Sequence, residues 1–121
     1  MNVASEQAVH GLATRLELPA LVRTLQEVLG QRMVAVIAGV SDVKAVGKWA
    51  RGERTPHPDA DRRLRDAFQI TQLLLQNESA STVRAWFTGM NPDLDDQSPA
   101  LMLPEHPQDV LLAARNFLAN G

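Results

Sequence analysis

Apolar residues recur along most of this chain at intervals of three and four positions, which is the period of one buried face of an α-helix. Leu21 and Leu25 show this spacing between Pro19, which is tolerated in the first turn of a helix, and Gly30, which commonly follows the last turn. No stretch alternates apolar and polar residues as a half-buried strand does. The pattern predicts an all-α protein with a loose helix within 1–17, firm helices at 19–29, 31–38, 42–51, 59–76, 81–88 and 108–119, and a short helical turn at 99–103.

The most distinctive segment lies between residues 34 and 52. Ala35 places a small side chain where two helices approach closely, and Gly39 suits the positive φ of a tight helix exit. Ser41 is expected to cap the next helix. Asp42 places a negative charge at the N-terminal end of that helix, where the helix dipole is positive. Two helices that cross over such a turn form a helix-turn-helix unit, whose second helix can enter the major groove of DNA.

The predicted second helix of this unit carries its cations away from its apolar side. Lys44, Lys48 and Arg51 stand at i, i+4 and i+7, which places them on one face. A helix that is buried on one side and cationic on the other can contact phosphates and base edges. Arg54 in the following connector is placed for a contact with the DNA backbone. The predicted DNA-binding residues are therefore Ser41, Lys44, Lys48, Arg51 and Arg54, and an ordinary solvated lysine face is the alternative interpretation.

Charge is distributed unevenly along the 121 residues, although the net charge is only −2. Residues 30–70 hold eight basic against five acidic residues, whereas residues 71–121 hold two basic against six acidic ones. A basic middle and an acidic end indicate two surfaces for two kinds of partner, with ordinary solvated faces as the alternative. Arg62, Arg63 and Arg65 stand beside aspartates and are expected to be neutralised locally.

The sequence offers no apparatus for catalysis. It contains no cysteine, and its three histidines, His10, His57 and His106, stand far apart. The acidic stretch 93–96 lacks the residue order of a calcium loop, and no phosphate-binding or nucleophile motif is present. We therefore expect no catalytic residue, metal site or cofactor. The absence of an apolar run of about 18 residues and of a signal peptide predicts a soluble, cytoplasmic protein without a membrane segment.

Over roughly residues 20–121 the chain resembles the Xre/MbcA/ParS family of antitoxins. The resemblance is carried by the run from Ala35 to Ser41 with Trp49 and Gly52, by Ala85-Trp86-Phe87, Asn91-Pro92, Leu94, Ser98-Pro99-Ala100 and Leu103, and by the end of the last helix, Phe117 to Gly121. It implies an antitoxin that is not an enzyme, that forms a homodimer and binds its own operator DNA, and that neutralises a RES-domain toxin. Such toxins are similar to ADP-ribosyltransferases and use or consume NAD. The residues that the resemblance places against the toxin are Trp86, Met90, Asn91, Asn120 and Gly121.

These features divide the chain into an N-terminal extension at 1–18, a helix-turn-helix DNA-binding domain at 19–77 and a small C-terminal toxin-binding helical domain at 78–121. In most Xre-type motifs the turn glycine and the tryptophan are one residue closer than Gly39 and Trp49 are here, so the second helix is expected to begin later or to be rotated. Two alternatives stay open: a stand-alone helix-turn-helix transcriptional regulator whose C-terminal region dimerises or senses a ligand, and an interaction module with a degenerate DNA-binding motif.

Overall fold

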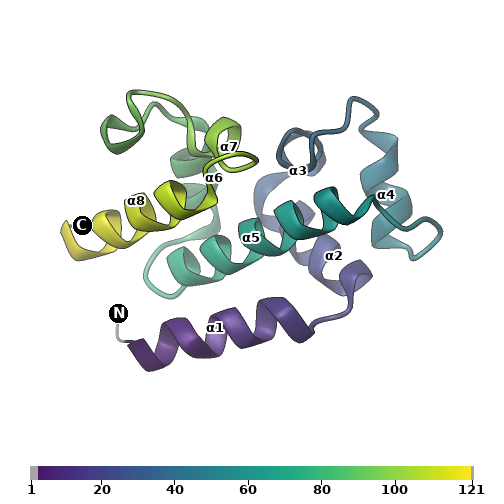
Figure 1. Ribbon diagram of the computed structural model, residues 1–121, viewed down its shortest axis with the longest axis horizontal. Coiled ribbons are helices and arrows are strands. Elements are labelled where there is room, and N and C mark those ends of the chain that lie inside the picture. The colour runs from purple at the N-terminus through teal and green to yellow at the C-terminus, as the bar shows by residue number, and fades with distance from the viewer. Residues whose placement is uncertain (1–2, 121) are drawn as a thin grey trace.

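The computed structural model describes residues 3–120, and over this range the chain is helical with no strand (Figure 1). The predicted fold class, all-α, is confirmed. No helix in this range combines the length and apolar character that crossing a membrane requires. In chain order the elements are α1 (Val3–Arg15), α2 (Leu18–Leu29), α3 (Gln31–Ala38), α4 (Lys44–Ala50), α5 (Pro58–Leu75), α6 (Ala80–Thr88), the 3-10 turn η1 (Pro92–Leu94), α7 (Pro99–Met102) and α8 (Pro107–Asn120).

The long helix α5 is the centre of the fold. It runs through the middle of the molecule and contacts α1, α2, α3, α6 and α8 (Figure 1). Pro58 stands in its first turn, where the missing N–H does no harm, and Leu64, Phe68 and Leu74 are buried along it. A helix in contact with so many others needs an apolar surface wider than one stripe, and the buried residues of α5 supply it.

The first helix packs along α5. Val9 and Ala13 are buried, and the side chain of His10 lies 3.4 Å from the Gln69 amide oxygen. At the other end of the chain, α6 contacts α2, and α7 contacts α3. Buried residues from all these elements form one continuous cluster, which crosses the predicted domain boundary near residue 78. The segments on either side of that boundary therefore share one core.

Four arginines tie the helices together by a common device, which we call the arginine clamps. Each donates a hydrogen bond to main-chain carbonyl oxygens at the C-terminal end of another helix. Those carbonyls have no partner within their own helix, and they carry the negative end of its dipole. The four clamps are Arg23 on Ala50 of α4 (2.8 Å), Arg63 on Ala38 of α3 (3.2 Å), Arg65 on Ala13 and Leu16 at the end of α1 (3.0 and 2.8 Å), and Arg84 on Val28 of α2 (3.0 Å).

Candidate functional site

Helix α3 and helix α4 contact each other and are joined by residues 39–43. Gly39 has φ +78°, the left-handed conformation that its position predicted. Its N–H donates to Val36 and the N–H of Val40 donates to Ala35, so the last carbonyls of α3 are satisfied by the turn. Ala35 is buried at this approach, as expected from its small side chain.

The start of α4 differs from the prediction. The helix begins at Lys44 rather than at Asp42, and the prediction that Ser41 caps it is wrong. The Asp42 carboxylate accepts the hydrogen bond of the Lys44 N–H at 3.0 Å, while Ser41 lies exposed in the turn. The helix thus begins two residues later than predicted, and Asp42 rather than Ser41 is in reach of the N–H of its first residue.

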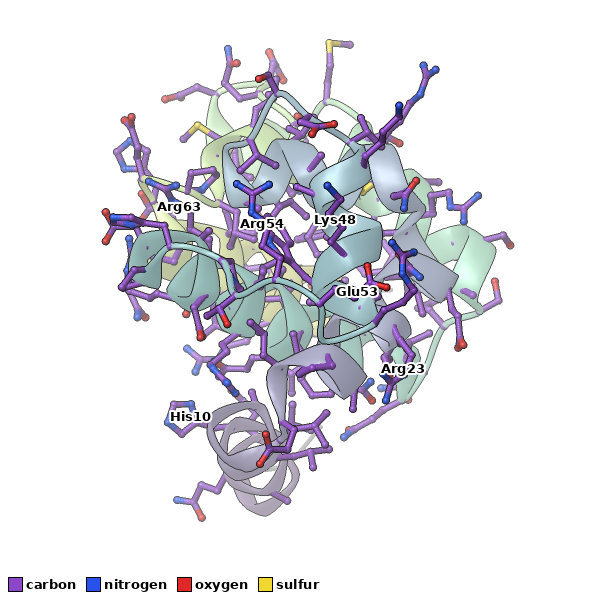
Figure 2. The ribbon with its side chains drawn as sticks, turned by 90° about the vertical axis from the view of Figure 1, so that its right-hand side faces the viewer. His10, Arg23, Lys48, Glu53, Arg54 and Arg63 are labelled. Atoms are coloured by element: carbon purple, nitrogen blue, oxygen red, sulfur yellow. The ribbon has the colours of Figure 1, made fainter. Side chains whose placement is uncertain are left out.

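The two sides of α4 differ as its sequence predicted. Ala45, Val46 and Trp49 are buried, whereas Lys44 and Lys48 are exposed. Figure 2 shows Lys48 and Arg54 on the same face of the molecule, with Glu53 beside them. The exposed side of α4 and the connector after it thus form one surface.

Three of the four cations without a partner belong to this surface. Most cations in the described part of the chain are either arginine clamps or members of ion pairs: Arg51 with Glu53, Arg62 with Asp66, and Arg115 with Glu6. Among the side chains that the structure describes, four cations have neither a hydrogen bond nor an ion pair, namely Arg32, Lys44, Lys48 and Arg54. All four belong to α3, α4 or the connector that follows α4.

Arg51 is the last cation of this group and is the one that has a partner. Its Nε lies 3.1 Å from Glu53 Oε1, and its Nη2 lies 3.1 Å from Glu53 Oε2. The hydrogen bonds and charge of Arg51 lower the pKa of the Glu53 carboxyl, and Lys48 adds to this effect. The same pair raises the pKa of Arg51. The two side chains are 59% and 56% exposed, so the pair lies on the surface rather than in the core.

Sequence reasoning missed the contribution of the start of α3. A Cβ placed on Gly47 of α4 would lie 3.0 Å from Gln31 Nε2 and 3.2 Å from Arg51 Nη1, so both side chains lie over this glycine. Arg32 is exposed one residue further along α3. The signal in the sequence was the pair of polar residues Gln31 and Arg32 directly after Gly30. They stand in the first turn of α3, and Gln31 lies against α4.

A second surface lies at the other end of the molecule. Trp86, Met90 and Asn91 line one hollow of about 340 Å³ together with Phe117 of α8. The Trp86 and Phe117 rings are 6.4 Å apart between centroids, and Met90 is 81% exposed. The structure thus brings together three of the five residues that the resemblance places against a toxin. Phe87, the neighbour of Trp86, is fully buried in the core.

The loop beside this hollow is held by its own polar groups. The Asn91 side chain accepts the hydrogen bond of the Asp93 N–H at 2.9 Å, and Asn116 of α8 donates to the Asp93 carboxylate at 3.2 Å. Asn120 is exposed at the end of α8, one turn beyond Asn116, and is not among the residues that line the hollow. Gly121, the last predicted toxin contact, lies outside the described residues.

In the part of the chain that the structure describes, no group of three or more histidine or acidic side chains is close enough to hold a metal ion. Comparisons of the chain with family models, with characterised proteins and with solved structures found no match.

Proposed function

We propose that this chain is an antitoxin that binds operator DNA through α3, α4 and the connector after α4, and that neutralises a RES-domain toxin through the surface around Trp86 and Met90. The resemblance of the sequence to Xre/MbcA/ParS antitoxins is the source of both partners. The distribution of unpartnered cations supports the first of them.

One observation carries the DNA-binding half. Arg32, Lys44, Lys48 and Arg54 have no hydrogen-bonded or ion-paired partner, although most other described cations do. Affinity for DNA depends first on cations that can neutralise phosphates, and a cation already bonded to a carboxylate or carbonyl is less able to do so. Although the chain is acidic overall, three of its four available cations therefore belong to α4 and the connector after it, and Arg32 lies at the start of the adjoining α3.

The proposed mechanism follows from the two sides of α4. Trp49 and Val46 bury one side in the core, and the other side presents Lys44, Lys48 and Arg51 to the major groove. Lysines act on phosphates as point charges, whereas an arginine can also recognise a guanine edge. In a homodimer, two copies of α4 would meet half-sites about 34 Å apart along the duplex.

Charge reversal on α4 tests this half. Lys48→Glu combined with Arg51→Glu is expected to abolish gel retardation of a duplex taken from upstream of the chain's own gene. Both positions are exposed, so the far-UV circular dichroism should not change. Gln97→Glu combined with Gln108→Glu, exposed on other elements, controls for added negative charge. Unaltered retardation by the first variant would refute the proposed contact face.

The toxin-binding half is supported by the character of the second surface. Met90 is 81% exposed beside the half-buried Trp86 and Phe117, and exposed apolar groups next to aromatic ones are common at protein interfaces. Asp93 lines the same hollow, and Asp95 and Asp96 are exposed in the loop that follows it, so the negative charge there suits a basic partner cleft.

A point substitution tests this half better than a truncation does. A chain ending near Gly89 would fail to protect cells from the toxin, but it would also lose α8, whose Val110 and Ala114 belong to the core. Met90→Glu avoids this problem, because the side chain is mostly in solvent. It should weaken capture of the toxin encoded beside the antitoxin gene and leave the melting temperature unchanged. Leu112→Glu on α8, also exposed, is the matched control.

The alternative is a stand-alone regulator whose C-terminal helices dimerise or sense a ligand. An apolar hollow of about 410 Å³ favours it, because Met33 and Val36 of α3 meet Leu101 of α7 there, and Leu101 is 64% exposed. Co-expression with the neighbouring gene product, followed by pull-down, separates the two functions. Only the antitoxin should hold that product stably.

A further inference from the structure

Glu53 holds Arg51 by one defined edge of its guanidinium group. The carboxylate oxygens accept hydrogen bonds from Nε and Nη2, each at 3.1 Å. A guanidinium has five N–H donors arranged around a rigid plane, so this pairing leaves the edge between Nη1 and Nη2 free. That edge presents two parallel donors, which match the O6 and N7 acceptors of guanine in the major groove.

The backbone fixes Glu53 relative to α4. Gly52 has φ +72° and donates to the Trp49 carbonyl at 3.0 Å, and the N–H of Glu53 donates to the Lys48 carbonyl at 2.9 Å. These two bonds form the motif that ends many helices at a left-handed glycine. The backbone of Glu53 is therefore fixed to the last turn of α4, and its side chain starts from a defined position beside Arg51.

Arg51 also has a neighbour on the side away from Glu53. Its Nη1 and the Gln31 amide nitrogen both lie over Gly47, where a side chain would meet them at 3.2 and 3.0 Å. The guanidinium therefore lies between Glu53 and the start of α3. It still remains 59% exposed, so a base edge can reach it.

Neither folding stability nor general affinity for DNA explains a glutamate at position 53. Ion pairs between exposed groups contribute little to folding stability. A carboxylate among Lys44, Lys48 and Arg54 also opposes their attraction to phosphates, which lowers affinity for any duplex. The remaining effect of Glu53 is on the direction in which Arg51 points.

We propose that Glu53 is a positioning residue that orients Arg51 toward a guanine in the operator, so that the preferred half-site contains that guanine. This inference rests on the proposed DNA-binding function. Glu53 lowers the affinity for DNA in general and raises the preference for one base pair. A residue with a merely structural role would not affect these two quantities in opposite directions.

The test begins with selection of bound sequences from a randomised 30-base-pair duplex library, with the full-length chain as the bait. Equilibrium binding is then measured to the selected duplex, to duplexes in which each guanine is replaced in turn, and to a scrambled duplex of the same composition. The variants are Arg51→Ala, Glu53→Gln and the matched control Glu105→Gln, which removes the same charge at an exposed position elsewhere. Circular dichroism checks that each variant is folded.

The wild type should prefer guanine at one position by roughly 5- to 150-fold, the range of a bidentate base contact. Arg51→Ala should lose this preference. Glu53→Gln should reduce it about threefold or more, yet bind the scrambled duplex as tightly as the wild type or more tightly. Glu105→Gln should change neither quantity.

Results of two kinds would overturn the inference, and the experiment distinguishes them. An unchanged preference in Glu53→Gln, or a selected sequence whose guanines do not depend on Arg51, would refute the positioning role and leave DNA binding intact. Failure of the wild type to retain any duplex at low salt would instead refute the proposed DNA-binding function, and the inference with it.

Discussion

The guanidinium of Arg23 on α2 donates a 2.8 Å hydrogen bond to the carbonyl oxygen of Ala50, the last residue of α4. This contact holds the end of the helix that carries Lys48 and leads into Arg51. With seven residues, α4 is too short to be stable as an isolated helix in water, so tertiary contacts must keep it in place. Arg23 is one of these contacts, although it does not belong to the cationic surface.

Removing this clamp should destabilise the fold. We expect Arg23→Ala to lower the free energy of unfolding by about 1–2 kcal/mol, since it removes a charge-assisted hydrogen bond at a helix C-terminus. Urea unfolding followed by circular dichroism measures the change. Arg32→Ala removes the same charge at an exposed position without a partner, and it should leave the free energy of unfolding nearly unchanged. Equal effects of the two variants would contradict the clamp.

Salt dependence should separate available cations from paired ones. If Arg54 contacts a phosphate, Arg54→Ala should reduce the slope of log K against log salt concentration by about 0.9. Arg62, whose Nη1 lies 3.6 Å from Asp66, is already partly neutralised, and Arg62→Ala should leave the slope unchanged. Titrations of one duplex at four salt concentrations provide the slopes. A larger change for Arg62→Ala than for Arg54→Ala would contradict our placement of the interface.

Two glycines should respond to alanine in opposite directions. Gly47 has helical conformation and meets only the flexible ends of Gln31 and Arg51, so Gly47→Ala should raise the free energy of unfolding by about 0.5–1 kcal/mol. The same change should weaken selective DNA binding, because it displaces those two ends. Gly39 has φ +78° and lies against Arg63, so Gly39→Ala should lower stability by about 1–2 kcal/mol. Thermal unfolding measures both changes in stability, and a change in the same direction for the two variants would refute the prediction.

The carboxyl of Asp66 should make stability depend on pH. Its partial burial raises its pKa, although the charges of Arg62 and His10 act against this rise. The folded chain therefore binds the proton more tightly than the unfolded chain does, so this carboxyl opposes folding progressively as pH rises through the two pKa values. Asp66→Asn should stabilise the protein at pH 7, and the gain should disappear below about pH 3. Urea unfolding at both pH values tests this, and an equal gain at pH 3 would contradict it.

The helices could be predicted from the sequence because their signals are local. The apolar period, Pro19 at the start of α2 and the left-handed Gly39 at the end of α3 all act within a few residues of the element that they define. The start of α4 was the exception. This helix begins two residues later than predicted, and the N–H of Lys44 is bonded by Asp42 rather than by Ser41.

The division of the cations into structural and available groups could not be predicted. Arg62, Arg63 and Arg65 were expected to be neutralised by nearby aspartates, and two of them are ion-paired with Asp66 and Asp61. The other, Arg63, clamps Ala38 instead. Arginine clamps join residues that are 25 to 56 positions apart, and a backbone carbonyl gives no sign of its partner in the sequence.

The C-terminal surface was predicted in part. Trp86, Met90 and Asn91 were identified through a family resemblance, and they line one hollow. Phe117 completes it from α8, although the resemblance included this residue only as part of the end of the last helix. Its place beside Trp86 depends on how α8 packs against the rest of the molecule, and this has no local signal.

The arginine clamps also make the chain unequally tolerant of genetic drift. The acceptor at positions 38 and 50 is a main-chain carbonyl oxygen, which a residue small enough for these buried sites supplies whatever its type. A change at the arginine itself removes the bond, and lysine restores only part of it because it lacks the planar group. Each of these two bonds therefore depends on the identity of one side chain only, because burial restricts Ala38 and Ala50 in size but not in their ability to accept the bond.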